Sequence, residues 1–148
     1  MMQAAMILID TNVISELMRL KPAPAVLDWF GHQDAAALHL SAVGEAELRR
    51  GAVILPEGKR RERLIAEIDA MVGEDFGGRV LPFDSAAAKA FADIFADRRA
   101  AGRPISFPDC QIAAIARACG AAMVTRNVGD FAGCGVEVID PWQHPEGG

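Results

Sequence analysis

The sequence predicts an α/β fold in which a parallel sheet carries helices on both faces, and three observations support it. A run of apolar residues ending at Asp10 is typical of a buried strand, and a helical pattern begins at Val13. Strand-like and helix-like segments then alternate along the chain, as in parallel sheets. Hydrophobic residues make up 51% of the chain but aromatic ones only 6%, which indicates a core of small and aliphatic side chains.

Five segments are expected to form the strands. The first has four consecutive apolar residues before its carboxylate, and the second alternates enough to form a strand ending at Ser41. Pro82 has no backbone N–H to donate, which favours an edge position for the third strand. The expected strands are Met6–Asp10, Ala37–Ser41, Val80–Phe83, Ala122–Thr125 and Val136–Ile139.

Helices are expected between these strands. Ser41 and Asp84 are residue types preferred at helix N-caps, and the clearest amphipathic pattern begins at Lys59. The helix after Asp84 is expected to carry an apolar face made of Ala88, Phe91, Ala92 and Phe95. The expected helices are Val13–Leu20, Ala25–Phe30, Ser41 towards Gly51, Lys59–Val72, Asp84–Ala101 and Pro108–Cys119.

The chain is expected to form a single domain over residues 1–141, followed by a loose C-terminal tail over 142–148. It has no run of 18 apolar residues, which argues against a membrane span. Its three cysteines form no Cys-x-x-Cys pair, which argues against a disulfide framework and a zinc site. The apolar N-terminus is short and lacks a basic region, so no signal peptide is expected and the expected location is cytoplasmic.

Four acidic residues lie at or near the ends of the expected elements. Asp10 ends the first strand, and Glu47 lies in the helix after the second. Asp109 opens the helix before the fourth strand, and Asp130 follows that strand. Each also has a structural interpretation: Asp10 as an N-cap, Glu47 as a solvated helical residue, Asp109 as part of a capping box with Ser106, and Asp130 as a turn former.

A parallel sheet brings strand ends to one edge, where Asp10 and Asp130 are both expected. Clustered carboxylates repel each other unless a cation lies among them. Mg²⁺ and Mn²⁺ prefer oxygen ligands, and such ions activate water and stabilise in-line displacement at phosphorus. The net charge of −5 argues against a protein that simply coats nucleic acid, and a divalent ion would invert the sign locally.

Four short segments carry these acids. They are Ile9–Glu16, Leu40-Ser41 leading to Glu47–Gly51, Pro108–Ala114 and Val124–Phe131. Their order and spacing, over nearly the whole chain, resemble the PIN-domain ribonucleases that act as toxins in bacterial toxin–antitoxin pairs, in particular the subgroup typified by VapC and FitB. Cys110 departs from the usual Ala of that family and is expected to be a packing residue.

The resemblance implies a three-layer α/β/α sandwich around a mainly parallel sheet, and cleavage of RNA by an endonuclease that depends on Mg²⁺ or Mn²⁺. It implies that the catalytic and metal-binding residues are Asp10, Glu47, Asp109 and Asp130. Asp10 and Asp109 are expected to be the direct metal ligands. The implied supporting residues are Thr11, Asn12, Thr125 and Asn127, the last of which stands where some relatives carry Asp and so leaves the fourth acidic place open between Asp130 and Asn127.

The resemblance also implies a homodimer and a cognate antitoxin that inserts a segment near the acids. Apolar residues that could form its groove, or equally belong to the core, are Leu17, Met18, Trp29 and Phe30. Basic residues are clustered at Arg49-Arg50, Lys59–Arg63, and Arg98-Arg99 with Arg103. They are either solvated helix faces or phosphate-positioning groups, and Arg49 and Arg50 are the preferred RNA-positioning pair because they lie next to Glu47.

Two other functions are open at this point. A phosphatase or phospho-acceptor domain would use Asp10 as a nucleophile, but such folds usually have a second acid two residues later and a Lys in a late loop, where this chain has Asn12 and Arg126. A non-catalytic interaction domain would share the fold without a working site. Triad chemistry has little support, because His32, His39 and His144 lie outside the acidic segments.

Overall fold

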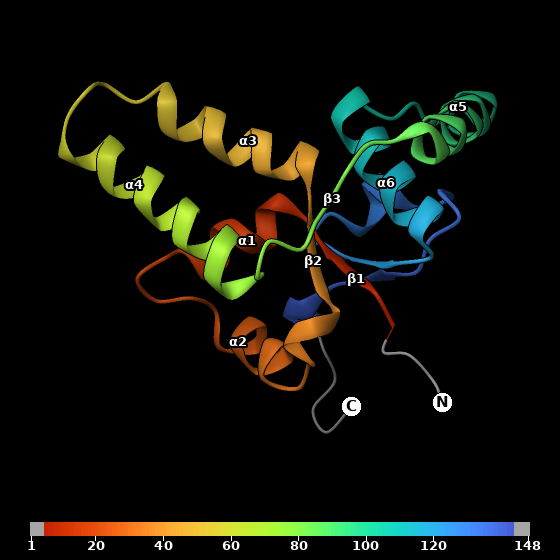
Figure 1. Cartoon of the computed structure of the whole chain (residues 1–148). Coiled ribbons are helices and arrows are strands. Elements are labelled where there is room, and N and C mark those ends of the chain that lie inside the picture. The colour runs from red at the N-terminus through yellow and green to blue at the C-terminus, as the bar shows by residue number, and fades with distance from the viewer. Residues whose placement is uncertain (1–4, 144–148) are drawn as a thin grey trace.

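The computed structural model describes residues 5–143 (Figure 1). Five short parallel strands form its central sheet, in the order β3-β2-β1-β4-β5. The strands are β1 Ile7–Ile9, β2 Leu38–Ser41, β3 Val80–Leu81, β4 Ala122–Val124 and β5 Val138–Ile139. The prediction of five strands is confirmed, although each strand is shorter than expected; β2, for example, begins one residue later. β3 lies at an edge, as Pro82 indicated.

Six α-helices follow the order that the sequence predicted. They are α1 Thr11–Leu17, α2 Pro24–Gly31, α3 Ala42–Val53, α4 Lys59–Ala70, α5 Ser85–Ala100 and α6 Phe107–Cys119. Both predicted N-caps are confirmed: Ser41 Oγ accepts the Gly44 N–H at 2.8 Å, and Asp84 Oδ1 accepts the Ala87 N–H at 3.0 Å. α4 continues into a π-helical turn, Met71–Asp75, beyond the expected end at Val72.

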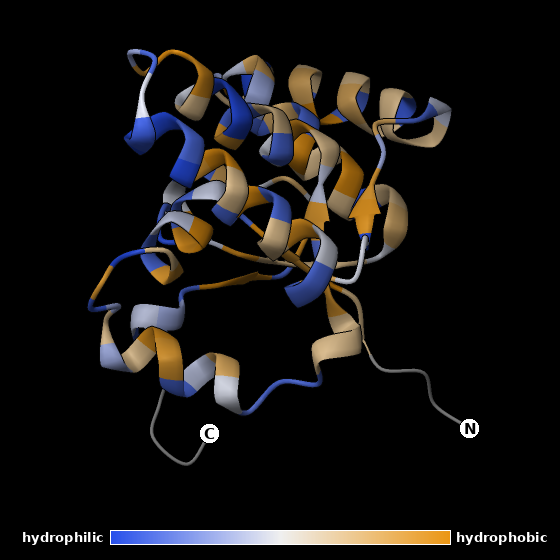
Figure 2. Ribbon diagram, turned by 60° about the vertical axis from the view of Figure 1, so that its left-hand side comes forward, coloured by the Kyte–Doolittle hydropathy of each residue, from blue (hydrophilic) through white to orange (hydrophobic). Residues whose placement is uncertain are grey.

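Alternating side chains of the strands divide the core into two parts. Leu8 and Met123 point to the face that α5 and α6 cover, whereas Ile9 and Val124 point to the face covered by α1 and α2. Figure 2 shows that the strands are mostly hydrophobic and that the helices around them alternate between hydrophobic and hydrophilic residues. This confirms the three-layer α/β/α sandwich.

One helix presents only part of its expected apolar face to the core: Phe91 and Phe95 pack against the core as expected, but Ala88 and Ala92 do not. In α5, Ala88 and Ala92 are exposed, and the buried residues are Ala87, Ile94 and Arg98. The reason is that Phe91 and Phe95 lie at the side of the α5–α6 contact, where both rings pack edge to face against Phe107. Alanine is small enough for either face, so the apolar pattern of the sequence did not fix the rotation of the helix.

The start of the expected C-terminal tail is folded. Pro141–Gln143 form a 3-10 helix that packs against α2, with Pro141 buried. The guanidinium of Arg126 lies 4.7 Å from the centre of the Trp142 ring, a cation–π contact. The remainder of the expected tail, residues 144–148, lies outside the described residues. None of the helices within residues 5–143 is long and apolar enough to cross a membrane.

Candidate active site

Asp10 lies where the strand order of the sheet reverses. The chain leaves β1 towards β2 on one side, and β4 lies on the other side of β1. Such a reversal opens a crevice at the carboxyl ends of the strands, where α/β proteins bind their ligands. Thr125, the residue after β4, donates a hydrogen bond of 2.8 Å from its hydroxyl to Asp10 Oδ2. Asp10 also caps α1, since its Oδ1 accepts the Thr11 N–H at 2.8 Å, which confirms the capping interpretation for a carboxylate that also lies at this crevice.

The predicted supporting residues surround this carboxylate. The Asn12 side-chain amide donates to Asp10 Oδ2 at 3.3 Å and to Thr125 Oγ1 at 3.2 Å, and its carbonyl accepts the Arg126 N–H at 3.3 Å. Asn127 contributes its backbone, whose N–H donates to Thr125 Oγ1 at 3.1 Å. Because both loops share these bonds, the ends of β1 and β4 are held in one fixed arrangement.

Glu47 reaches the same place from α3. Thr11, the first residue of α1, donates from its hydroxyl to Glu47 Oε1 at 3.1 Å. Glu47 is half-buried, so it is not the fully solvated helical residue of the structural interpretation. Thr11 thus connects the Asp10 loop to the acid on α3.

The other two acids come from the start of α6 and the loop after β4. Ser106 Oγ accepts the Asp109 N–H at 3.3 Å, which confirms the predicted cap and places Asp109 in the first turn of the helix. Asp130 lies in a short 3-10 helix, Val128–Phe131. Asp130 is exposed, and its negative charge contributes to raising the pKa of Asp109.

Burial and repulsion by neighbouring acids raise the pKa of Asp10 and of Asp109. For Asp10, which is 7% exposed, burial is the largest cause, hydrogen bonds from Thr125 and Thr11 oppose it, and the charges of Asp109 and Glu47 raise the pKa further. Burial also raises the pKa of Asp109, with the Ser106 hydrogen bond opposing it and Asp130 adding to it. The four acids therefore form one electrostatic cluster.

This cluster is open rather than closed around a single point. Within residues 5–143, no three acidic, histidine or cysteine side chains lie close enough together to hold a metal ion by themselves. An ion at this edge would therefore take part of its coordination from water or a ligand. The neighbouring Cys110 is fully buried, and burial raises the pKa of its thiol to about 11, which fits a packing role.

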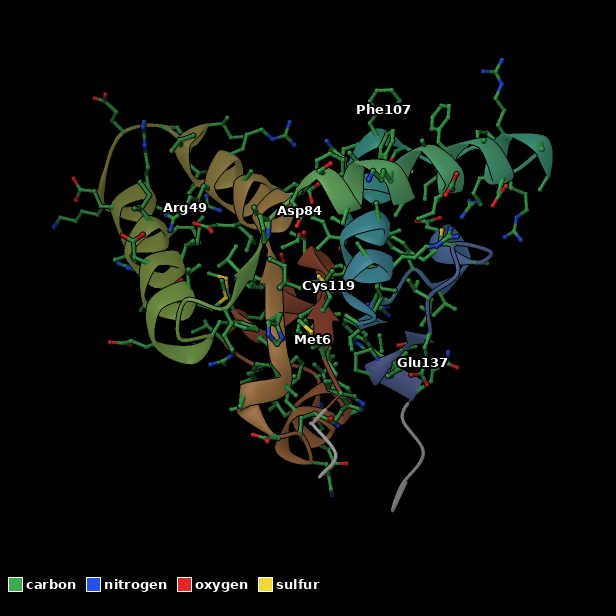
Figure 3. The ribbon with its side chains drawn as sticks, turned by 45° about the vertical axis from the view of Figure 1, so that its right-hand side comes forward. Met6, Arg49, Asp84, Phe107, Cys119 and Glu137 are labelled. Atoms are coloured by element: carbon green, nitrogen blue, oxygen red, sulfur yellow. The ribbon has the colours of Figure 1, made fainter. Side chains whose placement is uncertain are left out.

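The two arginines next to Glu47 differ sharply. Arg49 lies between α3 and α4 (Figure 3), where Nε donates to Glu45 at 2.7 Å and Nη1 donates to Asp69 at 2.8 Å. These carboxylates occupy its guanidinium, which joins the two helices. Arg50 is exposed, and its side chain makes no hydrogen bond or ion pair in the described part of the chain.

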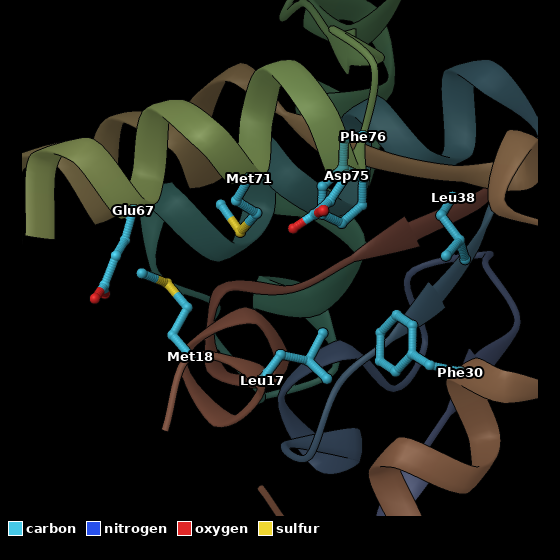
Figure 4. A pocket seen from close by; sticks show the side chains of 8 residues that line it. All are labelled: Leu17, Met18, Phe30, Leu38, Glu67, Met71, Asp75 and Phe76. Atoms are coloured by element: carbon cyan, nitrogen blue, oxygen red, sulfur yellow. The ribbon is translucent and has the colours of Figure 1, made fainter. Parts of the chain in front are cut away.

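Two neighbouring cavities lie beside α1. The first, about 310 Å³, is lined by Thr11, Ser15, Met18, Glu47, Leu48, Gly51, Leu64 and Ile68, and so reaches the acids. The second, about 390 Å³, is lined by Leu17, Met18, Phe30, Leu38, Glu67, Met71, Asp75 and Phe76 (Figure 4). Met18 lines both, and we call the two cavities together the apolar groove. Three of the four predicted groove residues line it, whereas Trp29 is buried in the core.

The sequence analysis did not predict the burial of Arg98, which lies on α5 and contacts the segment that carries Asp130. Its place in a basic cluster predicted a solvated or phosphate-binding side chain, but it is only 6% exposed and donates to backbone carbonyls, including that of Asp130. A signal was present, because Arg98 follows the buried Ile94 by four residues and so lies on the same face of α5.

The PIN domain model matches residues 7–132. The chain belongs to the PIN-domain family. Over 138 residues, 93% of this PIN-domain chain and 99% of each relative, it is 44% identical to the plasmid stability protein StbB of Pseudomonas syringae pv. tomato and 42% identical to the VapC ribonuclease Y4jK of Sinorhizobium fredii. It is 37% identical to the toxin FitB of Neisseria gonorrhoeae over 93% of this chain and 99% of that protein.

A solved structure, that of FitAB bound to an IR36 DNA fragment, has the same fold with a TM-score of 0.88. The likeness covers 95% of this PIN-domain chain and 99% of the compared chain, at 35% identity. The resemblance noted from the four acidic segments is thereby confirmed at the level of the family and its VapC and FitB members.

Proposed function

We propose that this PIN-domain chain is an endoribonuclease that depends on a divalent metal ion and acts as the toxin of a toxin–antitoxin pair. The observation that carries the proposal is that four carboxylates, from four separate segments, lie within electrostatic range of one another near the edge where the strand order reverses. The nearly buried Asp10 is destabilised in its charged form by Asp109 and Glu47, an arrangement that a cation relieves. The similarity of the chain to a VapC ribonuclease and to the toxin FitB supports RNA as the proposed substrate and toxin as the proposed biological role.

The donor set fits Mg²⁺ or Mn²⁺. It offers only oxygen atoms, and an open set suits an ion that keeps several waters and binds through one or two carboxylates together with a phosphate. We assign Asp10 and Asp109 as direct ligands, Glu47 as a ligand through water, and Asp130 as the residue that binds a second ion with the substrate. When bound, such an ion lowers the pKa of a coordinated water and stabilises the charge that develops on the phosphate.

The protein's own contribution is to fix the orientation of these carboxylates. Thr125 and Asn12 both donate to Oδ2 of Asp10, whereas Oδ1 accepts the Thr11 N–H and keeps its second lone pair for a metal. The hydrogen bond from Thr11 to Glu47 sets the distance between α1 and α3 on that side. We assign Arg50, whose guanidinium is available, to the positioning of an RNA phosphate, and not Arg49.

Two features argue against a phospho-acceptor function for Asp10. The residue two positions on, Asn12, donates to Asp10 instead of supplying a second acid. Arg126, at the place of the usual late-loop Lys, stacks on Trp142. Beryllofluoride, which mimics an aspartyl phosphate, is therefore expected to leave the protein unmodified, and stable trapping on Asp10 would favour the phospho-acceptor function.

The apolar groove is the site that we assign to an antitoxin. Its aliphatic, aromatic and methionine lining suits the apolar face of a helix, and its opening at Thr11 and Glu47 would bring a basic residue of that partner to the acids. A homodimer of the chain also belongs to the proposed assembly.

The direct test is cleavage of a mixed panel of RNAs by the purified protein with Mg²⁺, with Mn²⁺ and with chelator, beside Asp10→Asn. This variant keeps the cap of α1 and should fold normally. Cleavage that requires metal and is lost in the variant is expected. Metal binding without cleavage of any RNA would favour a non-catalytic interaction domain, and cleavage by Asp10→Asn at the wild-type rate would contradict the assignment of the site.

A further inference from the structure

Arg98 is a buried cation without an acidic partner. Its side chain is 6% exposed, and none of the carboxylates within residues 5–143 forms an ion pair with it. A buried charge is costly unless it is paired or fully hydrogen-bonded. The guanidinium uses backbone carbonyls in place of a carboxylate: Nε donates to Arg103 O at 2.6 Å, and Nη1 donates to Asp130 O at 2.8 Å and to Ala132 O at 2.9 Å.

These carbonyls belong to the two segments that carry one half of the acidic cluster. Arg103 lies in the loop that leads into α6, three residues before the cap Ser106. Asp130 and Ala132 lie in the turn after β4. One side chain thus ties together the backbones on either side of the Asp109–Asp130 pair.

The positive charge of Arg98 also lies within electrostatic range of Asp109, and it lowers the pKa of that carboxyl against the effects of burial and of Asp130. Among the described residues, no such cation acts on Asp10, and the Asp10–Glu47 half of the cluster depends on hydroxyl and amide donors instead. The two halves are therefore held by different means.

We propose that Arg98 is the positioning residue of the Asp109–Asp130 half of the metal site: it fixes the two backbone segments that present these acids and holds a buried positive charge within range of Asp109. This inference rests on the proposed function, because it requires that a divalent ion binds at the cluster. A positive charge alone is not sufficient, since three carbonyls in different directions need the planar, multi-donor guanidinium.

The test is the affinity for Mn²⁺ without RNA, measured by calorimetry on wild type, Arg98→Lys and Arg98→Met. Lysine keeps the charge but cannot reach the three carbonyls, and methionine removes both. We expect Mn²⁺ binding to weaken about 10- to 100-fold, as when a group that orients metal ligands is lost. A loss of equal size in both variants assigns the effect to geometry, and a smaller loss in Arg98→Lys assigns part of it to charge; either result supports the proposal.

Arg79 provides a matched control. It also ties backbone segments together, with bonds to Leu38 O at 2.9 Å, Ala35 O at 2.7 Å and Asp75 O at 3.4 Å, but near the start of β2 and away from the acids. Arg79→Lys should lower the Tm without weakening Mn²⁺ binding. Arg98 variants that bind Mn²⁺ like wild type below their Tm would show that the residue is merely structural and overturn the proposal.

A second variant covers the case in which Arg98 variants fail to fold. The exposed Arg103 donates to Gly129 O at 3.3 Å, a weaker link between the same two segments. Arg103→Ala should reduce Mn²⁺ affinity by a smaller factor, and unchanged affinity there would then overturn the proposal. Wild type that binds no Mn²⁺ would overturn the metal site itself, whereas wild-type binding that Arg98 variants retain contradicts only the role of Arg98.

Discussion

The hydroxyl of Thr125 donates a hydrogen bond of 2.8 Å to Asp10 Oδ2, and this bond joins the ends of the two strands between which the sheet reverses its order. Thr125 is fully buried and Asp10 nearly so. In a buried setting a carboxylate without its donors would be strongly disfavoured. The bond therefore orients the carboxylate that we propose as a metal ligand, and it favours the ionised form of that carboxylate where burial raises its pKa.

Thr125→Val tests this relationship because it removes the hydroxyl but preserves the shape of the side chain. We expect Mn²⁺ affinity and RNA cleavage to fall about 10- to 100-fold. The free energy of unfolding should fall by about 1–3 kcal/mol, because a buried acceptor loses its donor. Thr125→Ser keeps the hydroxyl and should bind Mn²⁺ almost as well as wild type. The measurements are calorimetry with Mn²⁺ and urea unfolding, and equal affinities for the Val and Ser variants would contradict the argument.

Arg50 and Arg49 form a neighbouring pair for testing RNA contacts. Arg50→Ala should raise KM and reduce the slope of log KM against log salt concentration by about one phosphate contact, roughly 0.7 for a single strand. Arg49→Ala should leave both unchanged, because Glu45 and Asp69 already occupy that guanidinium. The measurement is the cleavage of one RNA by each variant at several salt concentrations. An equal effect of the two substitutions would be evidence against the assignment of Arg50 as the RNA-positioning residue.

Leu17→Glu places a charge in the apolar groove. We expect it to weaken binding of the antitoxin by about 2 kcal/mol or more, as for a central interface residue, which is roughly 30-fold in Kd. Ile54→Glu is the matched control, since Ile54 is 73% exposed on the end of α3 and does not line the groove. Direct binding of the purified partner to each variant measures the effect, and the groove assignment fails if the two substitutions weaken binding equally.

The surroundings of Asp10 could be predicted in part from the sequence because strand ends and helix caps are local signals. A run of apolar residues followed by Asp10, and a short strand followed by Thr125, already place both residues at the carboxyl edge of a parallel sheet. The caps at Ser41, Asp84 and Ser106 are equally local, and all three are confirmed.

Long-range pairing was not accessible in the same way. Whether Arg49 faces RNA or Asp69 depends on how α4 folds back on α3, and whether Arg98 is exposed depends on the rotation of α5 against α6. In α5, alanines on several sides give no unique apolar face, so the sequence left open which side the core takes. The folding of Trp142 against α2 is likewise a contact between distant segments.

Glu16 gives a pH-dependent contribution to stability that is independent of catalysis. It is 7% exposed, its Oε2 accepts the Ala23 N–H at 2.8 Å, and its Oε1 accepts from Arg19 Nη1 at 3.2 Å. The bond from Ala23 is the main cause that lowers the pKa of Glu16, with Arg19 and Arg126 adding to it against burial. A lowered folded-state pKa means that this stabilisation is complete above the unfolded value, about 4.3, and disappears as the pH falls through the folded value.

Glu16→Gln should therefore lower the Tm at pH 7, and the gap to wild type should narrow below about pH 4 as the carboxyl of the wild type is protonated. The exposed Glu62 on α4 provides the control, because Glu62→Gln should have little effect at either pH. Thermal unfolding at pH 7, 5, 4 and 3 is the measurement. A gap of constant size across this range would mean that the shape of the side chain, and not its charge, holds the turn between α1 and α2.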